Sequence, residues 1–318
     1  MAIGGYFSLE LPLREEFHKK AIRLNTGRNC LEYILRVRKY KKVYMPYYTC
    51  EVILEPFKKL DITYEFYRIN LQFEIADEIQ LQKEEALLYT NYFGLKQKYV
   101  KQLAEKYGTQ LIVDNTQAFY AKPIDRIDTF YTCRKFFGVA DGAYLHTNTL
   151  INEEFEQDES YDRMTHLLKR IDLSAKEGYV DFRKADDRLD NQPIRRMSKL
   201  TQRIMQSINY NEITQVRRKN YQFLHDYLAS TNQLHLPMDH DVVPMVYPYL
   251  SENKSIKQKL ISEKIYVATY WPNVMEWCNV EDWEYKLAEQ TVFIPIDQRY
   301  GSDEMKRIIT IIQKCLNK

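Results

Sequence analysis

Glycine is scarce in this sequence, and patterns that mark membrane or secreted proteins are missing. Only 9 of the 318 residues are glycine, about 3% against a usual ~7%, so each glycine beside a turn or helix start is informative. No stretch approaches the ~20 apolar residues of a transmembrane helix. Residues 1–13 lack the basic start of a signal peptide and contain Glu10. We therefore expect neither a membrane span nor a secretory leader.

Paired cysteines and metal-binding histidine motifs are also missing. The five cysteines form no C-x-x-C pair and are odd in number: Cys30, Cys50, Cys133, Cys278 and Cys315. Reduced thiols in a cytoplasmic protein fit this pattern best. His235 and His240 flank Asp239, but no H-E-x-x-H motif occurs. We interpret this segment as a polar loop and predict no metal site.

A large charge of one sign is absent as well. There are 46 Lys and Arg against 44 Asp and Glu, which gives a formal net charge of +2. The basic runs at 195–196 and 217–219 lie among Glu and Gln and are typical of a solvated helix face. This balance does not favour a nucleic-acid partner. With 45% hydrophobic residues, the chain is a globular protein of about two domains.

What is present is an alternation of helix-like and strand-like segments in the first half. Strands are predicted at 42–46, 62–69, 86–94, 110–115, 128–132 and 142–147. Helices are predicted at 14–24, 25–35, 48–60 and 97–108. Short connections between these segments predict an α/β fold with a mainly parallel central sheet flanked by helices. Its ligand would lie beyond the carboxyl ends of the strands.

The second half has a different pattern. Residues 152–230 are charged and mostly helical in spacing, and strand signals return at 242–250, 265–271 and 291–296. A further helix is predicted at 302–316. We expect a large α/β domain over 1–210 and a smaller α+β domain over 211–318.

Two candidate sites follow from helix and strand ends. Gly27, Arg28 and Asn29 begin a helix, where backbone N–H groups and the helix dipole can bind phosphate, although a simple turn is the alternative. Asp114 directly follows an apolar strand. This carboxylate either caps the next turn or faces a cationic ring nitrogen, because an unpaired buried carboxylate is costly.

The third candidate is Lys135, on a turn between two strands. Phe130, Tyr131, Phe136 and Phe137 surround it in the sequence and would desolvate its amine, as Schiff-base chemistry requires. Thr132 lies three residues earlier and can reach the same ligand. A phosphate-binding helix, an Asp and a Lys in this order describe a site for pyridoxal 5′-phosphate (PLP).

These segments resemble those of the DegT/DnrJ/StrS sugar aminotransferases, which are fold-type-I PLP enzymes. The similarity is carried by "TGRNCLEYIL", "VYMPYYTCEVILEPF", "VDNTQAF", "TCRKFFGVADGAYL" and, near the C-terminus, "FIPIDQRYGSDEMKRI". The resemblance implies that Asp114 contacts the pyridine nitrogen, that Gln117 lies near the 3′-oxygen, and that Lys135 binds PLP. It also implies a homodimer.

The sequence departs from that family in several places. Cys50 falls where the family often has an aromatic residue that stacks on the cofactor, and Tyr48, Tyr92 and Phe93 are candidate substitutes. The usual Gly-Glu-Gly-Gly is replaced by residues 140–143, and the partner-subunit Asn-x-Arg-Met segment is only echoed by "IRRMS" at 194–198.

We therefore predict an aminotransferase that moves an amino group from an amino acid, glutamate by expectation, to a keto acceptor such as a nucleotide-sugar. Gly27, Arg28, Asn29 and Thr132 would bind the cofactor phosphate. Arg299 is a candidate for a substrate carboxylate, with a surface ion pair as the alternative. A PLP-dependent lyase or dehydratase, and a non-catalytic regulatory descendant, remain alternative functions.

Overall fold

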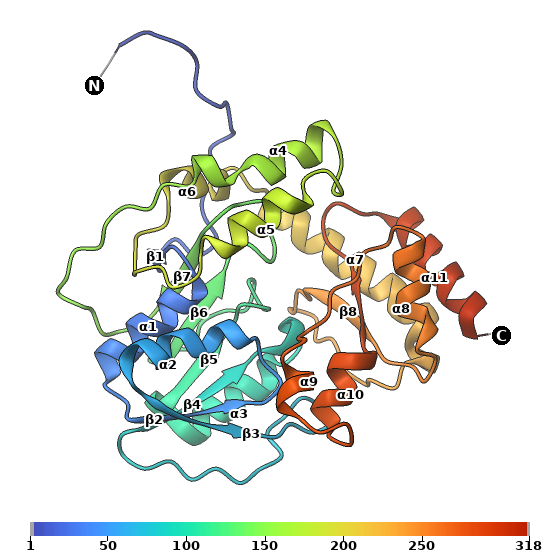
Figure 1. Ribbon diagram of the computed structural model, residues 1–318, viewed down its shortest axis with the longest axis horizontal. Helices are drawn as coiled ribbons and strands as arrows, with labels where there is room; N and C mark the ends of the chain where they lie inside the picture. The colour runs from blue at the N-terminus through green and yellow to red at the C-terminus, as the bar shows by residue number, and fades with distance from the viewer. Residues whose placement is uncertain (1–2, 317–318) are drawn as a thin grey trace.

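A seven-stranded sheet forms the centre of the computed structural model, which describes residues 3–316 (Figure 1). The strands are β1 (Ile22–Leu24), β2 (Lys42–Pro46), β3 (Thr63–Tyr67), β4 (Glu85–Thr90), β5 (Leu111–Asp114), β6 (Asp128–Thr132) and β7 (Ala143–His146). Their order is β1-β7-β6-β5-β4-β2-β3. Strands β2 to β6 pair in parallel, whereas β7 is antiparallel to β6 and β1. The predicted mainly parallel sheet is confirmed.

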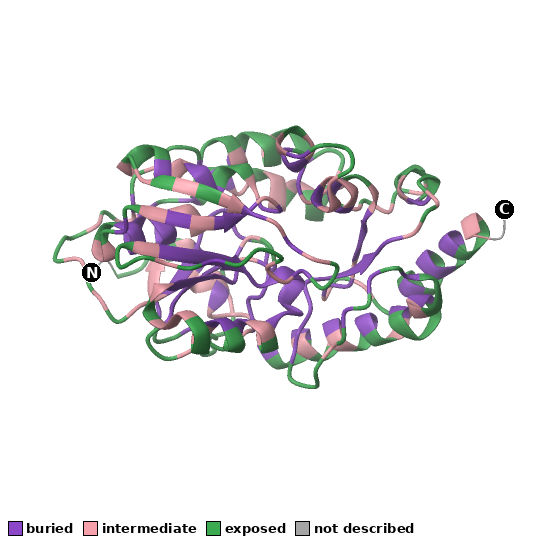
Figure 2. Cartoon of the chain, turned by 90° about the horizontal axis from the view of Figure 1, so that it is seen from below, coloured by how far each residue is buried: buried purple, intermediate pink, exposed green. Residues whose placement is uncertain are grey.

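Both faces of the sheet are buried, which explains its nearly continuous apolar strands. In β4, Ala86 and Leu88 pack on the face covered by α1 (Gly27–Arg38) and α2 (Glu55–Leu60). Leu87 and Tyr89 belong to the opposite face, together with residues of α3 (Gln97–Tyr107). Figure 2 shows this arrangement, with buried strands inside and exposed outer helix faces.

The second half adds helices and a small second sheet. The helices are α4 (Thr165–Asp172), α5 (Tyr179–Asp187), α6 (Lys199–Met205), α7 (Tyr210–Leu228), α8 (Ser255–Ser262), α9 (Val274–Trp277), α10 (Trp283–Gln290) and α11 (Ser302–Leu316). Strands β8 (Val246–Tyr249) and β9 (Val292–Pro295) pair antiparallel. Short 3₁₀ turns occur at Glu51–Leu54, Tyr92–Gly94, Gly108–Gln110, Tyr161–Arg163 and Ala229–Thr231.

The apolar core runs without a break from the central sheet into the C-terminal part. The boundary at residue 210 between the predicted domains 1–210 and 211–318 therefore stays a prediction. Helix α7 begins at this point, and α11 packs on both α7 and α8. None of the helices within residues 3–316 has the length and apolar character to cross a bilayer.

Two predicted elements are wrong. Residues 14–24 form turns and the edge strand β1 instead of a helix. Their helical spacing arises because Phe17 packs on Phe119 and Tyr210, while Ala21 and Leu24 are buried by separate parts of the core. The strand predicted at 265–271 is reduced to one bridge, between Ala268 and Phe293.

Candidate active site

Two neighbouring strands end in the residues that the sequence singled out. Asp114 ends β5 and Thr132 ends β6, and the two strands are paired in parallel, so both residues lie at the same edge of the sheet. The turn after β6 carries Lys135. Asp114 is 5% exposed and Thr132 is 9% exposed. The carboxyl edge of the sheet therefore brings the predicted carboxylate, hydroxyl and amine into one region, as expected for parallel sheets.

Thr116 joins these groups. Its backbone N–H donates to Oδ1 of Asp114 at 2.8 Å, and its hydroxyl accepts a hydrogen bond from Nζ of Lys135 at 3.0 Å. Its methyl group lies 3.3 Å from where a Cβ on Gly27 would stand. One residue thus contacts the lysine, the aspartate and the start of α1. Thr116 was not among the predicted site residues, although it lies between Asp114 and Gln117 in the segment "VDNTQAF".

The carboxylate of Asp114 is electrostatically unfavourable without a cation. Burial raises the pKa of Asp114, and the Lys135 amine and the hydrogen bonds from Thr116 oppose that rise. A cationic ring nitrogen placed against this carboxylate would further favour its ionised form. The sequence offered two roles, a cap or a partner for a cation, and this geometry contains features of both.

Helix α1 begins at the same edge with a formed cap. The Thr26 hydroxyl accepts from the backbone N–H of Asn29 at 3.1 Å, as an N-cap does. The Asn29 side chain is already bonded, because its Nδ2 donates to the carbonyl of Gln192 at 3.0 Å. Gly27 packs so closely on Thr116 that a Cβ at this position would crowd the threonine methyl group, at 3.3 Å. The backbone at this helix start, rather than the Asn29 side chain, is available to an anion.

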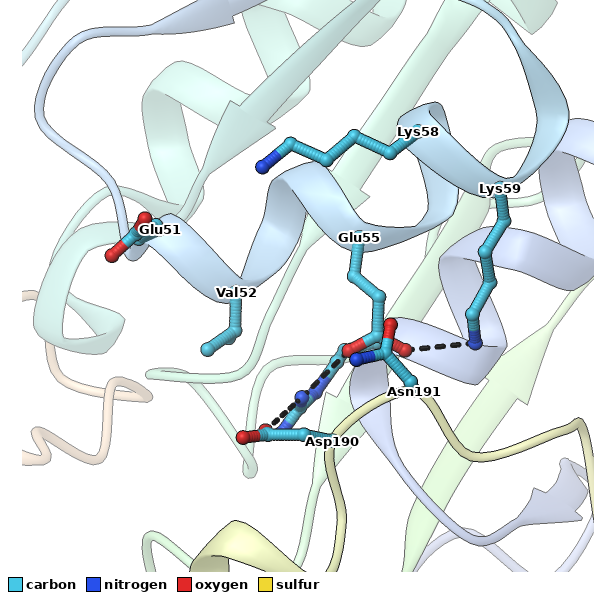
Figure 3. Close-up of a pocket in the computed structure, with 8 residues that line it drawn as sticks. Glu51, Val52, Glu55, Lys58, Lys59, Asp190 and Asn191 are labelled. Atoms are coloured by element: carbon cyan, nitrogen blue, oxygen red, sulfur yellow. Dashed lines mark hydrogen bonds and ion pairs between the residues drawn. The ribbon is translucent and has the colours of Figure 1, made fainter.

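The Arg28 guanidinium is held by two carboxylates, those of Glu55 and Asp190, which are labelled in Figure 3. It donates to Glu55 at 2.8 Å and to Asp190 at 2.6 Å, and Lys59 also contacts Glu55 at 2.8 Å. These residues line a polar cavity of about 550 Å³. Burial opposes the charge of Arg28, but the two carboxylates together raise its pKa. A phosphate would have to compete with both carboxylates for this side chain.

Lys135 lies on the wall of a larger cavity of about 760 Å³, a size ordinary for small-molecule sites. The expectation that aromatic neighbours desolvate its amine is wrong for the protein alone. Phe136 and Phe137 are buried, but their rings pack against Phe119, whereas the Lys135 side chain is exposed. The Lys135 amine therefore lies between this cavity and the turn formed by residues 114–116.

Gln117 contains a buried donor without an acceptor. Its Oε1 accepts from the backbone N–H of Phe93 at 3.1 Å, which fixes the amide. Its Nε2 has no hydrogen-bond partner among residues 3–316, although the residue is fully buried. Such an unpaired donor is costly unless a ligand oxygen supplies the acceptor.

The three aromatic candidates for stacking on a cofactor are packed into the core. Tyr48, Tyr92 and Phe93 are each 0% exposed and contact Phe73. Cys50, in contrast, is partly exposed, and the charges of Lys135, Arg28 and Asp114 all act on the pKa of its thiol, which burial raises. Cys50 is therefore close enough to Lys135 for the charge of the amine to act on its thiol, and its side chain is much smaller than an aromatic ring.

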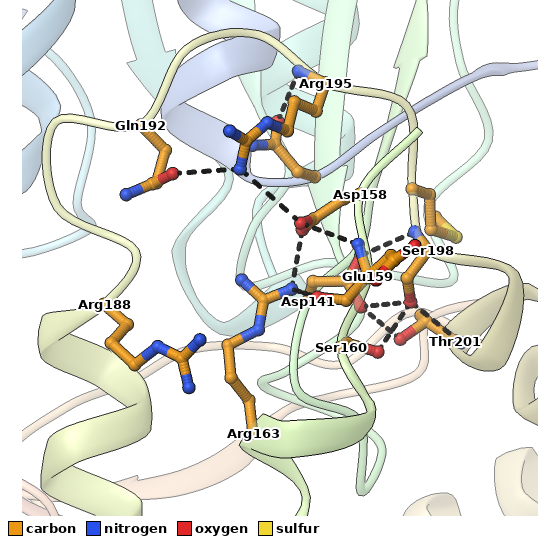
Figure 4. A network of polar contacts seen from close by, with 12 residues as sticks. Asp141, Asp158, Glu159, Ser160, Arg163, Arg188, Gln192, Arg195, Ser198 and Thr201 are labelled. Atoms are coloured by element: carbon orange, nitrogen blue, oxygen red, sulfur yellow. Dashed lines mark hydrogen bonds and ion pairs between the residues drawn. The ribbon is translucent and has the colours of Figure 1, made fainter. Parts of the chain in front are cut away.

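A buried polar network fixes the loop that follows the lysine (Figure 4). Asp141 accepts from the backbone N–H of Ser198 at 2.8 Å and from its hydroxyl at 2.7 Å, and it also accepts from the hydroxyl of Thr201. The Ser198 hydroxyl meets that of Ser160 at 2.7 Å. The two segments that depart from the resembled family, 140–143 and 194–198, are thus bonded to each other.

Arg299 reaches the cavity beside Lys135 but is paired. Its guanidinium donates to both oxygens of Asp297, at 2.7 and 2.8 Å. The Asp297 pKa is lowered, because bonds from Arg299 outweigh the burial that would raise it. Arg299 therefore forms an ion pair at the wall of the cavity, and its role toward a substrate carboxylate stays a prediction.

No family model and no curated protein sequence matches the chain. Solved structures with a similar fold do match it. DesV from S. venezuelae, in complex with a ketimine intermediate, shares 13% identity at a TM-score of 0.63 over 92% of this chain and 84% of its own. NtdA from Bacillus subtilis, with bound cofactor PMP, shares 13% identity at 0.66 over 94% and 73%. The sugar aminotransferase CalS13 from Micromonospora echinospora shares 14% identity at 0.61 over 93% and 88%. The chain therefore has the fold of these DegT/DnrJ/EryC1/StrS-type enzymes.

Proposed function

We propose that the protein is a PLP-dependent aminotransferase that takes an amino group from an amino acid such as glutamate and transfers it to a keto group, as on a sugar. The observation that carries this proposal is the junction at Thr116, which links Lys135, Asp114 and the start of α1. Structural neighbours that bind PMP or catalyse sugar transamination support it.

The residues present fit the cofactor. The buried Nε2 of Gln117 lacks an acceptor, and the carboxylate of Asp114 lacks a full cationic partner. In the proposed arrangement Lys135 holds the cofactor, Asp114 faces its ring nitrogen and Gln117 its 3′-oxygen. The α1 start at Gly27 and the Thr132 hydroxyl hold its phosphate, with Arg28 and Asn29 flanking it.

When bound, PLP supplies an aldehyde carbon for the amine and a ring that accepts electrons. The residues of the chain itself would orient the bound groups and hold or move protons. Asp114 would keep a proton on the ring nitrogen, and Nζ of Lys135 would take the proton from the donor's Cα and deliver it to the C4′ carbon of the cofactor. Thr116, within hydrogen-bond distance of Nζ, positions that amine. Tyr48 is fully buried against Phe73 and Tyr92, so its contact with the cofactor stays a prediction.

The test is spectroscopic. Purified protein with PLP is expected to show the visible absorption band of a lysine-bound cofactor, and Lys135→Ala is expected to lose it. Lys101→Ala, on the exposed face of α3, is the matched control. An unchanged band in Lys135→Ala would reject the assignment. Formation of 2-oxoglutarate from glutamate then separates transamination from lyase or dehydratase chemistry.

A second candidate function is a non-catalytic descendant of these enzymes. Cys50 in place of a stacking aromatic, and Arg28 held by Glu55 and Asp190, favour it. No PLP binding at saturating cofactor is its expected result.

A homodimer and a cytoplasmic location are further proposals. Apolar side chains of the N-terminal arm, such as Tyr6 and Phe7, are almost fully exposed and suit a contact with a second copy. Light scattering would test the dimer, since a monomer at working concentration contradicts it.

A further inference from the structure

The turn that carries Lys135 is held by a side chain from the C-terminal part of the chain. Gln298 lies in the loop between β9 and α11, and its Nε2 donates to the backbone carbonyl of Phe136 at 2.8 Å. Within residues 3–316 this carbonyl accepts no other hydrogen bond. Phe136 directly follows Lys135 and is 3% exposed, so an unpaired carbonyl here would be costly. A residue 162 positions away thus fixes the backbone beside the amine.

Arg217 on α7 orients the amide of Gln298. A guanidinium only donates hydrogen bonds and a carbonyl only accepts them, so one orientation of the amide satisfies both neighbours. Nη2 of Arg217 donates to Oε1 of Gln298 at 3.1 Å, which leaves Nε2 for Phe136. Arg217 is 1% exposed, and its Nη1 donates to the carbonyl of Met245 at 3.0 Å. Its guanidinium carbon also lies 4.7 Å from the centre of the Phe136 ring, so Arg217 contacts the lysine turn by two routes.

Helix α7 fixes the loop that carries Gln298 as well. Asn220 lies on the same face of α7 as Arg217, three positions further along, and is 3% exposed. Its Nδ2 donates to the carbonyl of Ile296 at 3.2 Å and to that of Tyr300 at 2.9 Å. These two bonds hold the loop on either side of Gln298. The place of Gln298 is therefore set by α7 through the backbone of the loop and through its own side chain.

We propose that Gln298 and Arg217 are positioning residues for Lys135, because they fix the backbone of the lysine turn and thereby the place of the amine. The Lys135 side chain is exposed and has a single hydrogen bond in the described structure, to Thr116, so a shift of its backbone moves Nζ away from Thr116. A misplacement of about 1 Å is enough to slow chemistry strongly. The importance of this amine rests on the proposed function, whereas the hold on the turn does not.

Hydrogen exchange in the cofactor-free protein measures the hold on the turn. Mass spectrometry follows a peptide that covers residues 133–139, in which the N–H groups of Phe136 and Phe137 both donate to the carbonyl of Cys133 at 3.0 Å. Gln298→Leu removes the donor to Phe136 with little change in volume. Loss of this bond is expected to speed exchange of the peptide by about 3- to 10-fold. Exchange at the wild-type rate would overturn the proposal.

Gln298→Glu separates positioning from general stability. Its carboxylate still accepts from Arg217, now with opposite charges, but it cannot donate to the carbonyl of Phe136. We expect an unfolding temperature no lower than that of Gln298→Leu, together with exchange at 133–139 as fast as in Gln298→Leu. Wild-type exchange in Gln298→Glu would show that the bond to Phe136 does not hold the turn.

Gln233→Glu is the matched control for the added charge. Gln233 is exposed, and its side chain forms no hydrogen bond within the part of the chain that the structure describes. Exchange at 133–139 should equal that of wild type. Faster exchange in this control would show a general effect of charge and overturn the proposal.

Bound PLP reports the place of the amine. The pH at which the visible band of the lysine-bound cofactor is half-converted should differ between Gln298→Leu and wild type, because no charge changes at position 298 and only the surroundings of Nζ do. An unchanged midpoint would overturn the positioning role even where exchange is faster. A wild-type protein without the band would reject the proposed function instead, and exchange then tests the hold on the turn by itself.

Arg217→Met removes the group that orients the Gln298 amide. Its unfolding temperature is measured first, because Arg217 is buried. If the variant folds, exchange at 133–139 should rise at least as much as in Gln298→Leu, since the contact with the Phe136 ring is lost too. Wild-type exchange would exclude Arg217. If the variant does not fold, the two Gln298 variants decide.

Discussion

Replacing Gly142 by alanine should destabilise the fold and disturb the lysine turn together. Gly142 has φ of +109°, and a Cβ built on it would lie 2.8 Å from Cγ2 of Thr201 and 3.2 Å from Sγ of Cys133. Its carbonyl accepts from the backbone N–H of Cys133 at 2.9 Å, and its N–H donates to the carbonyl of Asn25 at 2.6 Å. The glycine thus ties the lysine turn to the segment before α1.

The magnitude follows from two effects. A non-glycine residue at this φ costs about 1–3 kcal/mol, and the overpacking adds about 1–3 kcal/mol. With unfolding entropy near ~2.1 cal/mol/K per residue, 1 kcal/mol lowers the Tm of a 318-residue chain by roughly 1.5 °C. The two effects together predict a Tm lower by roughly 3–9 °C.

Gly108→Ala is the control, because Gly108 also has a positive φ, +53°, but nothing lies within 4 Å of its Cβ position. Because its ψ of −135° lies outside the left-handed helical region, alanine there costs about 1–3 kcal/mol of backbone strain, but without the overpacking at Gly142. Thermal unfolding by circular dichroism measures both variants, and absorbance with PLP measures cofactor affinity, which should fall in Gly142→Ala only. Equal Tm values for the two variants would refute the packing argument.

Three other substitutions give separate tests. Asp114→Asn should stabilise the cofactor-free protein at pH 7, because burial raises the pKa of Asp114 in the folded state. The gain in stability should vanish as the pH falls to about 4, the pKa of an unfolded aspartate. Urea unfolding at both pH values measures this gain, and a larger gain at the lower pH would contradict the prediction. Cys50→Tyr should slow PLP release several-fold by adding a ring surface beside Lys135, whereas faster release would show that the space is too small. Arg163→Met should cost about 3 kcal/mol, because it removes the nearer cation from the buried Asp158, which Arg163 contacts at 2.7 Å with both side chains 5% exposed (Figure 4). Among residues 3–316, Asp158 then keeps only the cation of Arg195, at 3.9 Å. An unchanged urea midpoint would contradict this.

The central sheet and the edge that carries the candidate site were predictable, because short segments of the sequence determine them. A parallel sheet buried on both faces requires apolar runs, and such runs preceded Asp114 and Thr132. Helix α1 was predictable from its cap at Thr26 and the apolar spacing behind it. These signals lie within a few residues of each other along the chain.

The surroundings of the site were not predictable, because they depend on contacts between distant segments. Arg28 meets Asp190, 162 positions away, so its partner left no signal beside Gly27. The segment that forms α4 has helical periodicity, but nothing in that periodicity indicates that Arg170 lines the same cavity as Lys135. Residues 14–24 show the opposite case, in which helical spacing is satisfied by separate tertiary contacts.

The presence of a carboxylate at position 114 is not explained by the stability of the cofactor-free fold. Its burial raises its pKa, so the ionised form costs free energy, and an asparagine could accept the same bond from the N–H of Thr116. The exposed amine of Lys135 offsets only part of that cost. A carboxylate at this position becomes favourable when a second cation arrives, and a protonated pyridine nitrogen is such a cation. Cofactor binding and ionisation of Asp114 are then linked, so PLP should raise the stability of the wild-type protein more at pH 7 than that of Asp114→Asn. Equal stabilisation of both proteins by PLP would show that the Asp114 carboxylate does not interact with the ring nitrogen.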